Sequence, residues 1–108
     1  MKYKIIPTDE FLKNLKKLAK KNKNIKKDIL DLIDILENNP KEGVYLGNNT
    51  YKIRLKNSNN NKGKSGGYRI ITYLIDENFE IYLITIYSKS NRESILDDEI
   101  KKLIKNLI

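Results

Sequence analysis

The sequence predicts a single α+β domain in which an antiparallel sheet carries an N-terminal αα-hairpin and a C-terminal helix, in the order β-α-α-β-β-β-α. Three observations predict it. Apolar residues recur at helical spacing in residues 9–38, three strand-like segments follow one another in residues 51–87, and another helical stripe lies near the C-terminus. A chain of 108 residues without internal repeats fits one domain, residues 1–108.

The N-terminal part of the chain predicts a short strand and a first helix. Residues 3–6 form a β-type run that Pro7 ends. Thr8 can cap the helix that follows, because its hydroxyl can accept a hydrogen bond from an amide of the first turn. The apolar stripe of this helix consists of Phe11, Leu12, Leu15, Leu18 and Ala19.

A second helix is predicted for residues 24–38, ended by Asn39 and Pro40. Because the link to the first helix is short, the two helices are expected to form an antiparallel hairpin. The apolar stripe of the second helix is Ile25, Ile29, Leu32, Ile33 and Leu36. Its exposed face is expected to carry Asp28, Asp31, Asp34 and Glu37.

The second half of the chain predicts the sheet. Residues 41–50 are expected to form a loop, residues 51–56 a strand with alternating polarity, and the polar, glycine-rich residues 57–67 a mobile connection. Residues 68–75 and 80–87 are expected to form two further strands, and consecutive strands with short links pair antiparallel. The helices before and after the strands are expected to cover one sheet face and leave the other available. The C-terminal helix has the stripe Ile100, Leu103, Ile104 and Leu107.

Composition restricts the chemistry. The 22 Lys and Arg against 14 Asp and Glu give a net charge of +8, which favours nucleic acid, an acidic protein or a membrane surface as partner. A Lys- and Asn-rich composition from an AT-rich genome explains the total charge equally well. Without Cys or His, the chain lacks thiolates, the commonest general base and the commonest metal ligand, and we expect no metal or other cofactor. No apolar run approaches the roughly 18 residues that span a bilayer and no signal-peptide core is present, so we expect a cytoplasmic protein.

The basic residues cluster in one stretch. Residues 43–75 contain no Asp or Glu but six basic side chains: Lys52, Arg54, Lys56, Lys62, Lys64 and Arg69. Alternation places the first three on one strand face, which suits either a phosphate-binding surface or an ordinary solvated face. The segment GKSG lacks the earlier glycine of a P-loop and runs into a strand, which excludes nucleotide binding of that type.

Arg69 is the strongest candidate for a functional side chain. It lies in an apolar strand, where an unpaired charge is costly, so it is expected either to pair with a carboxylate or to open onto a site. A guanidinium suits the second role because it binds phosphate oxygens bidentately. In an antiparallel ladder, Tyr87 and Lys89 at the end of the next strand can lie beside it. Tyr73, Tyr82 and Tyr87 can either stack on bases or pack in the core.

The segments YKIRL, GKSGGYRIITYL and IYLITIYSK, in this order of elements, resemble the RelE/ParE superfamily of type II toxin–antitoxin toxins. The GK-x-GG-x-R pattern followed by a strand is most similar to the HigB-like branch. The resemblance covers nearly the whole chain and is most specific in residues 51–89. It implies the RelE-like fold and a toxin that inhibits translation as a ribosome-dependent mRNA endoribonuclease.

The resemblance also implies roles for individual residues. In the implied metal-independent reaction, the mRNA 2′-OH attacks the adjacent phosphorus and the 5′-oxygen leaves. Arg69 matches the phosphate-binding arginine and Lys89 the basic residue after the final strand. The acid or base is a Lys of residues 51–56, a Lys of the loop such as Lys64, or a Tyr such as Tyr87. Several RelE-like members have a catalytic Tyr where this chain reads SNRESIL. Two interpretations stay open: Tyr87 or Tyr73 replaces it, or the role is only weakly filled. The residues expected to bind RNA are Lys52, Arg54, Lys56, Lys62 and Tyr73.

The implied partners are the ribosome and mRNA, a cognate antitoxin, and operator DNA only through that antitoxin. The HigB-like pattern suggests an antitoxin of the helix-turn-helix type, and no membrane partner is expected. Two alternatives stay open from the sequence. One is a ParE-like toxin that inhibits DNA gyrase, and the other is a non-catalytic RNA- or protein-binding module on the same scaffold.

Overall fold

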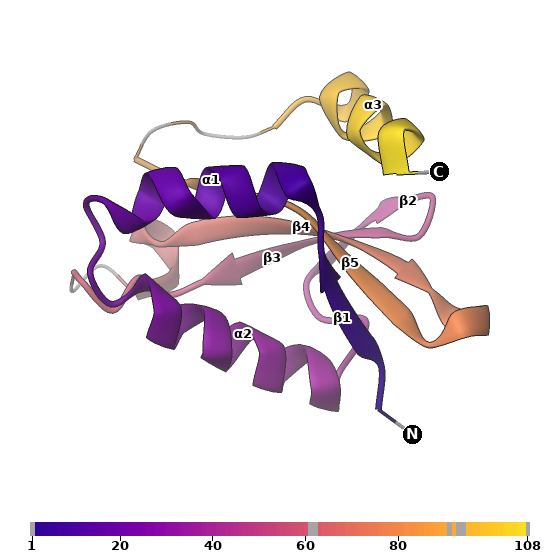
Figure 1. Cartoon of the computed structure of the whole chain (residues 1–108), viewed down its shortest axis with the longest axis horizontal. Coiled ribbons are helices and arrows are strands. Elements are labelled where there is room, and N and C mark those ends of the chain that lie inside the picture. The colour runs from indigo at the N-terminus through magenta and orange to yellow at the C-terminus, as the bar shows by residue number, and fades with distance from the viewer. Residues whose placement is uncertain (1, 61–62, 91, 93–94, 108) are drawn as a thin grey trace.

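The fold is α+β, as predicted, with three helices and one sheet. The computed structural model describes residues 2–60, 63–90, 92 and 95–107. Its strands are β1 (Lys4–Pro7), β2 (Val44–Gly47), β3 (Thr50–Leu55), β4 (Tyr68–Ile75) and β5 (Glu80–Ser88). Its helices are α1 (Asp9–Ala19), α2 (Ile25–Asn38) and α3 (Asp97–Leu107), with short 3-10 turns η1 (Gly63–Gly66) and η2 (Asp76–Asn78) (Figure 1).

The sheet has the spatial order β1-β5-β4-β3-β2. β3, β4 and β5 pair antiparallel, as the short connections predicted. β1 pairs parallel with β5 at one edge, so the N-terminal strand is joined to the end of the sheet farthest from β3. Strand β4 therefore has a neighbour on both sides, which explains its continuously apolar sequence.

The expected loop at residues 41–50 was wrong in part, because Val44–Gly47 forms the edge strand β2. It pairs antiparallel with β3 through a hairpin whose two central residues, Asn48 and Asn49, have positive φ angles of 52° and 61°. Asparagine tolerates this left-handed conformation, which a tight hairpin turn of this kind requires. The two asparagines were the signal for a hairpin.

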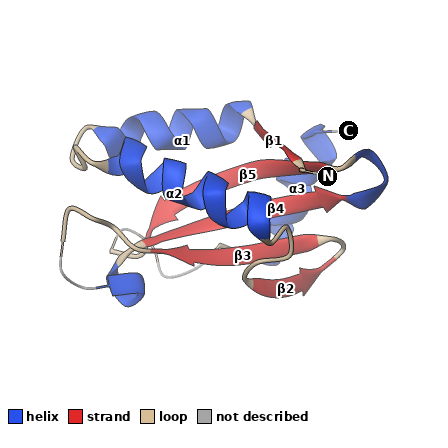
Figure 2. Ribbon diagram, turned by 90° about the horizontal axis from the view of Figure 1, so that it is seen from below, coloured by secondary structure: helices blue, strands red, loops and turns tan. Residues whose placement is uncertain are grey.

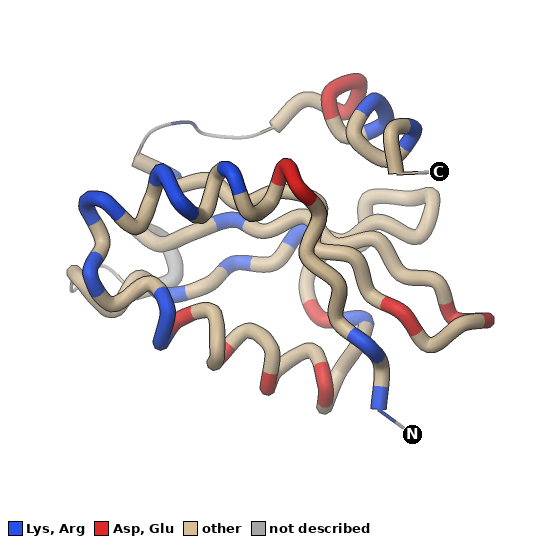
Figure 3. Tube along the Cα trace, viewed as in Figure 1, with Lys and Arg blue, Asp and Glu red and all other residues tan. Residues whose placement is uncertain are grey.

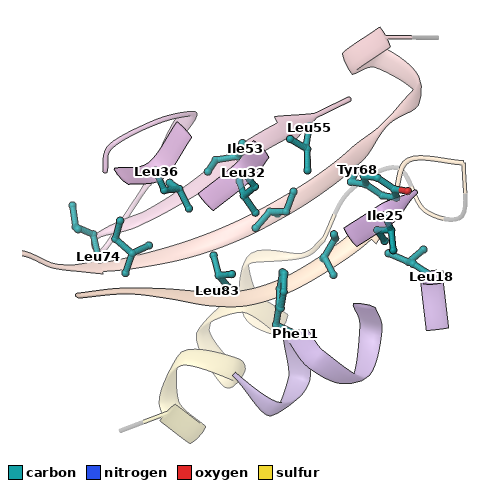
Figure 4. Close-up of a cluster of buried hydrophobic side chains, with 13 residues drawn as sticks. Phe11, Leu18, Ile25, Leu32, Leu36, Ile53, Leu55, Tyr68, Leu74 and Leu83 are labelled. Carbon is teal, nitrogen blue, oxygen red and sulfur yellow. The ribbon is translucent and has the colours of Figure 1, made fainter. Parts of the chain in front are cut away.

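Helices α1 and α2 cover one face of the sheet and run in opposite directions, as predicted for the hairpin (Figure 1). The Thr8 hydroxyl caps α1 by accepting a hydrogen bond of 3.2 Å from the Phe11 amide. Figure 4 shows the main core, in which Phe11, Leu32 and Leu36 from the helices meet strand residues such as Ile53. Leu12 and Ala19 were predicted to lie in the α1 stripe, but both are exposed.

The expectation that all helices share one sheet face was wrong, because α3 packs on the face opposite α1 and α2. Figure 2 shows α2 in front of the strands and α3 behind them. A second apolar cluster joins Ile71, Ile84 and Tyr87 of the strands to Ile100 of α3. The physical reason is that β4 and β5 are apolar on both faces, so each face needs a cover.

The expected mobile connection at residues 57–67 was also wrong in part. Asn57 is buried, and its side chain donates a hydrogen bond of 2.9 Å to Asn22 after α1. Residues Gly63–Gly66 form η1 directly before β4. The first residues of this connection are thus tied to the helices.

Candidate active site

Three side chains from three strands lie side by side on the face that α3 partly covers. Arg54 of β3 pairs in register with Arg69 of β4, and Arg69 pairs with Tyr87 of β5. Paired residues on adjacent strands point to the same face and their Cα atoms are about 5 Å apart. The register therefore joins two guanidinium groups and a phenol at one end of the sheet.

Gly67 allows β4 to begin this close to β3. A Cβ atom on Gly67 would lie 2.0 Å from the Leu55 carbonyl oxygen and 3.0 Å from the Asn57 amide nitrogen. Any larger residue would push β4 away from the end of β3, so the second glycine of the GG pair is required by sterics. The same glycine accepts a hydrogen bond of 3.1 Å from the Lys89 amide, which places Lys89 beside the start of β4.

Arg69 is buried, with 3% of its surface exposed. Its guanidinium donates a hydrogen bond of 3.2 Å to the carbonyl oxygen of Tyr68. Burial lowers the pKa of Arg69, and the positive charge of Arg54 lowers it further, whereas Tyr87 raises it. The side chain remains a cation at neutral pH, because an arginine pKa begins far above 7.

Tyr87 stands beside Arg69 with 7% of its surface exposed. Burial raises the pKa of Tyr87, while the Ile95 backbone and the charges of Arg69 and Arg92 act in the lowering direction. The Tyr87 hydroxyl meets no partner at hydrogen-bond geometry in the described part of the chain, although the Ile95 backbone lies close enough to affect its pKa. The phenol is protonated at neutral pH, but its oxygen is shielded from solvent, so donating a proton to a substrate requires the chain above it to move.

Arg92 and Glu99 complete the surroundings of Tyr87, and sequence reasoning missed both. The guanidinium carbon of Arg92 lies 5.4 Å from the centre of the Tyr87 ring. The same guanidinium donates two hydrogen bonds to the Glu99 carboxylate, of 2.9 and 3.1 Å, so the pair is bidentate. Glu99 lies in the first turn of α3, and the contact thus connects this helix to the Tyr87 ring. Arg92 lies in the segment SNRESIL, where the resemblance pointed to a Tyr and not to a second cation.

The other predicted residues divide into three groups. Lys52, Lys56 and Lys89 lie near Arg54 and Arg69: Lys52 is half-buried two positions before Arg54, exposed Lys56 follows β3, and half-buried Lys89 follows β5. Tyr73 does not belong to this end, since it pairs with Thr50 at the opposite end of β3 and lines a cavity under α3. Lys64 is in η1, and Lys62 lies outside the described residues.

The strands carry no acidic residue at this end of the sheet. Figure 3 shows acidic residues along α2, at the β4–β5 connection and at the start of α3, while β3 and the start of β4 carry only basic ones. In the described part of the chain, no group of three or more Asp or Glu residues could hold a metal ion. None of the described helices has the length and apolar character needed to cross a bilayer.

Comparison with known proteins decides the family. The family model for the RelE toxin of the RelE/RelB toxin–antitoxin system matches residues 10–107. The chain belongs to the RelE toxin family. It is therefore the toxin of a type II toxin–antitoxin system, of the class of ribosome-dependent mRNA endoribonucleases that the sequence resemblance implied. The match does not distinguish a HigB-like branch within the superfamily, and that assignment stays a prediction.

Solved structures agree with the RelE fold. The free E. coli toxin RelE carrying two arginine-to-alanine substitutions has 19% identity over 100% of both chains, with a TM-score of 0.65. The isolated E. coli RelE toxin has 22% identity over 98% of this chain and 99% of its own, with a TM-score of 0.55. A chain of the intact E. coli RelBE toxin–antitoxin complex has 25% identity over 78% of this chain and 93% of its own, with a TM-score of 0.53. A RelE-family toxin has a cognate antitoxin as partner.

Proposed function

We propose that this RelE-family toxin cleaves ribosome-bound mRNA by attack of a 2′-OH on the adjacent phosphorus, using protein side chains and no metal ion. The observation that carries the proposal is the alignment of Arg54, Arg69 and Tyr87 across three adjacent strands. Two guanidinium groups on neighbouring strands can hold the two non-bridging oxygens of one phosphate. They would stabilise the negative charge that grows on these oxygens in the transition state.

Tyr87 is the proton donor in this proposal. Its raised pKa keeps the phenol protonated at neutral pH, which suits an acid that protonates the leaving 5′-oxygen and makes a base less favourable. Lys52 or Lys89, which lie near Arg54 and Arg69, or Lys64 of η1 would then take the proton from the 2′-OH. The products are a 2′,3′-cyclic phosphate on one fragment and a free 5′-OH on the other.

The remaining partners follow from this role. Exposed Lys56 and Arg54 would bind the mRNA backbone, and Lys62 stays a candidate for the same task. The toxin would act in the cytoplasm, where it meets the ribosome, and would contact operator DNA only through its antitoxin. A helix-turn-helix antitoxin remains our expectation from the GK-x-GG-x-R pattern.

The test is cleavage of a translated mRNA in a purified ribosome system, with end-group analysis of the fragments. We expect cuts that leave a 5′-OH, and no cut where the nucleotide before the scissile bond is 2′-deoxy. Fragments with a 5′-phosphate, or unchanged cleavage of the 2′-deoxy mRNA, would contradict the mechanism. Inhibition of gyrase supercoiling without any mRNA cleavage would support the ParE-like alternative instead.

A further inference from the structure

A buried carboxylate lies on the opposite side of the sheet from Arg54 and Arg69. Asp28 in the first turn of α2 was predicted to face solvent, but only 3% of its surface is exposed. Its Oδ2 atom accepts a hydrogen bond of 3.0 Å from the backbone amide of Ser58. Burying a carboxylate is costly, so a fold that retains one at this point gains something from the contact.

Ser58 belongs to a run of polar residues that fastens the end of β3 to both helices. The Asn57 side chain donates to Asn22 (2.9 Å) and accepts from the Asn59 backbone amide (2.8 Å). The Asn59 side chain accepts from the backbone amide of Asn24, which precedes α2 (3.1 Å). We call this group the polar clamp: Asn22, Asn24, Asp28, Asn57, Ser58 and Asn59.

The polar clamp also reaches the start of β4. The Asn60 side chain donates a hydrogen bond of 3.4 Å to the carbonyl oxygen of Gly66. Tyr68 is fully buried beside Ile25 (Figure 4), and burial together with the nearby Asp28 charge raises the pKa of its phenol to about 12, against a lowering by Asn59. The carbonyl oxygen of the same Tyr68 accepts the hydrogen bond from Arg69. A chain of contacts therefore runs from Asp28 to both basic strands.

We propose that Asp28 and the polar clamp are positioning elements for the toxin's reaction, because they fix the exit from β3 relative to the entry into β4. Asp28 touches no substrate in this account. Asp28 holds Ser58 in place. Through Ser58 it fixes the direction in which exposed Lys56 leaves the sheet and the spacing between Arg54 and Arg69. A displacement of about 1 Å in such a pair can reduce a rate about 100-fold. The predicted effect of Asp28 on cleavage rests on the proposed function, whereas its predicted effect on the structure of residues 56–60 does not.

The first experiment measures kcat and KM for mRNA cleavage on the ribosome, well below the melting temperature of each variant. Asp28→Ala removes the acceptor for the Ser58 amide, and we expect kcat to fall about tenfold. Asp28→Asn keeps a side-chain oxygen and should restore most of the activity. Asp31→Ala, an exposed acid of the same helix, is the matched control and should behave as wild type. Equal kcat values for Asp28→Ala and wild type, or an equally inactive Asp28→Asn, would overturn the inference.

A second experiment tests the polar clamp without any RNA. In the free protein, Asp28→Ala should accelerate amide hydrogen exchange in residues 56–60 while the core strands stay protected. Unchanged exchange in this segment would overturn the inference even if wild-type toxin cleaves mRNA. If wild type proves inactive but exchange changes as expected, the proposed function fails and the structural half of the inference stands.

Asn59→Ala provides a milder variant if Asp28→Ala does not fold. Asn59 is exposed, and its loss removes the hydrogen bond to Asn24 without leaving a cavity in the core. We expect a kcat decrease of about threefold and faster exchange in residues 56–60. No change in either quantity would overturn the inference.

Discussion

The face of the sheet under α3 has two ends with opposite surroundings. At one end, Arg54, Arg69 and Tyr87 lie in register on adjacent strands. At the other end, Tyr73 and Tyr82 pack against α3 in an apolar cluster. Arg69 and Tyr73 are four residues apart on β4, which corresponds to about 13 Å along the strand. All three tyrosines belong to the apolar cluster under α3, and Tyr87 is the most buried of them. What separates Tyr87 from the other two is its position in register with Arg69.

The largest effect is expected from Arg69→Ala, since it removes a buried cation from the reactive end. Loss of one such stabilising group should lower the single-turnover cleavage rate about 100- to 1,000-fold. Arg69→Lys should recover only part of the rate, because an ammonium cannot bind phosphate bidentately. The measurement is mRNA cleavage on the ribosome, with Lys41→Ala as an exposed control outside the site. A folded Arg69→Ala toxin with wild-type rates would remove the distinction between the two ends.

Tyr87→Phe should follow, with a rate about 100-fold lower, because the substitution removes only the proton donor. Burial raises the pKa of Tyr87 above the ordinary tyrosine pKa of about 10. The wild-type hydroxyl should therefore stay protonated as the pH rises toward 10. The ratio of wild-type to variant rates should therefore be constant between pH 7 and about 9. A ratio that rises with pH in this range would show that the phenol acts in its ionised form.

Arg54→Ala should lower kcat/KM about tenfold, through both KM and kcat, because exposed Arg54 can bind the RNA phosphate before the reaction and stabilise it with Arg69 in the transition state. The loss should be greater at low salt than at high salt, since exposed charges are screened. Steady-state cleavage at two salt concentrations checks both points. A loss confined to KM would contradict a role for Arg54 beside Arg69 in the transition state.

Glu99→Gln should lower the cleavage rate by about fivefold or less, the scale of an exposed ion pair. The substitution breaks the ion pair with Arg92, so the guanidinium is no longer fixed over the Tyr87 ring. Cleavage assays on Glu99→Gln and on the Tyr87→Phe, Glu99→Gln double variant check this. Additive losses in the double variant would show that Glu99 does not act through Tyr87.

The smallest effect on cleavage is expected at the end of the sheet face that carries Tyr73 and Tyr82. Tyr73→Phe should leave the rate unchanged, and Tyr73→Ala should reduce the free energy of unfolding by about 1–3 kcal/mol through lost packing. Denaturant unfolding and the ribosome assay measure the two quantities. A large loss of cleavage in Tyr73→Phe would return Tyr73 to the RNA-binding surface.

Local patterns in the sequence were sufficient for most of the fold. Helical stripes and strand alternation gave the elements, and the alternation in residues 51–56 correctly placed Arg54 on the face opposite Ile53. Strand β2 was missed because its four residues, three of them exposed, show no alternation of apolar and polar side chains. Only the two asparagines of its turn mark it.

The surroundings of the site depend on contacts that no sequence spacing reveals. Two consecutive antiparallel strands predict that β3 and β4 are neighbours, but the sequence does not predict the register that pairs Arg54 with Arg69. Arg92 over Tyr87 and Asp28 under Ser58 join residues from separate elements across the fold. Asp28 in particular resembles its exposed neighbours on α2, because a helix pattern cannot show that a later loop will fold over one acid.

Crosslinking of a bound mRNA to the toxin tests the central claim most directly. A 2′-deoxy substitution at the scissile nucleotide would block cleavage on the ribosome, and a photoreactive 4-thiouridine beside it would mark the nearest protein residues. We predict crosslinks to residues 52–56 and 87–89, identified by mass spectrometry of the labelled peptides. Crosslinks confined to α3 or to the β2–β3 hairpin would place the RNA at the end of the sheet that carries Tyr73 and contradict the proposed site.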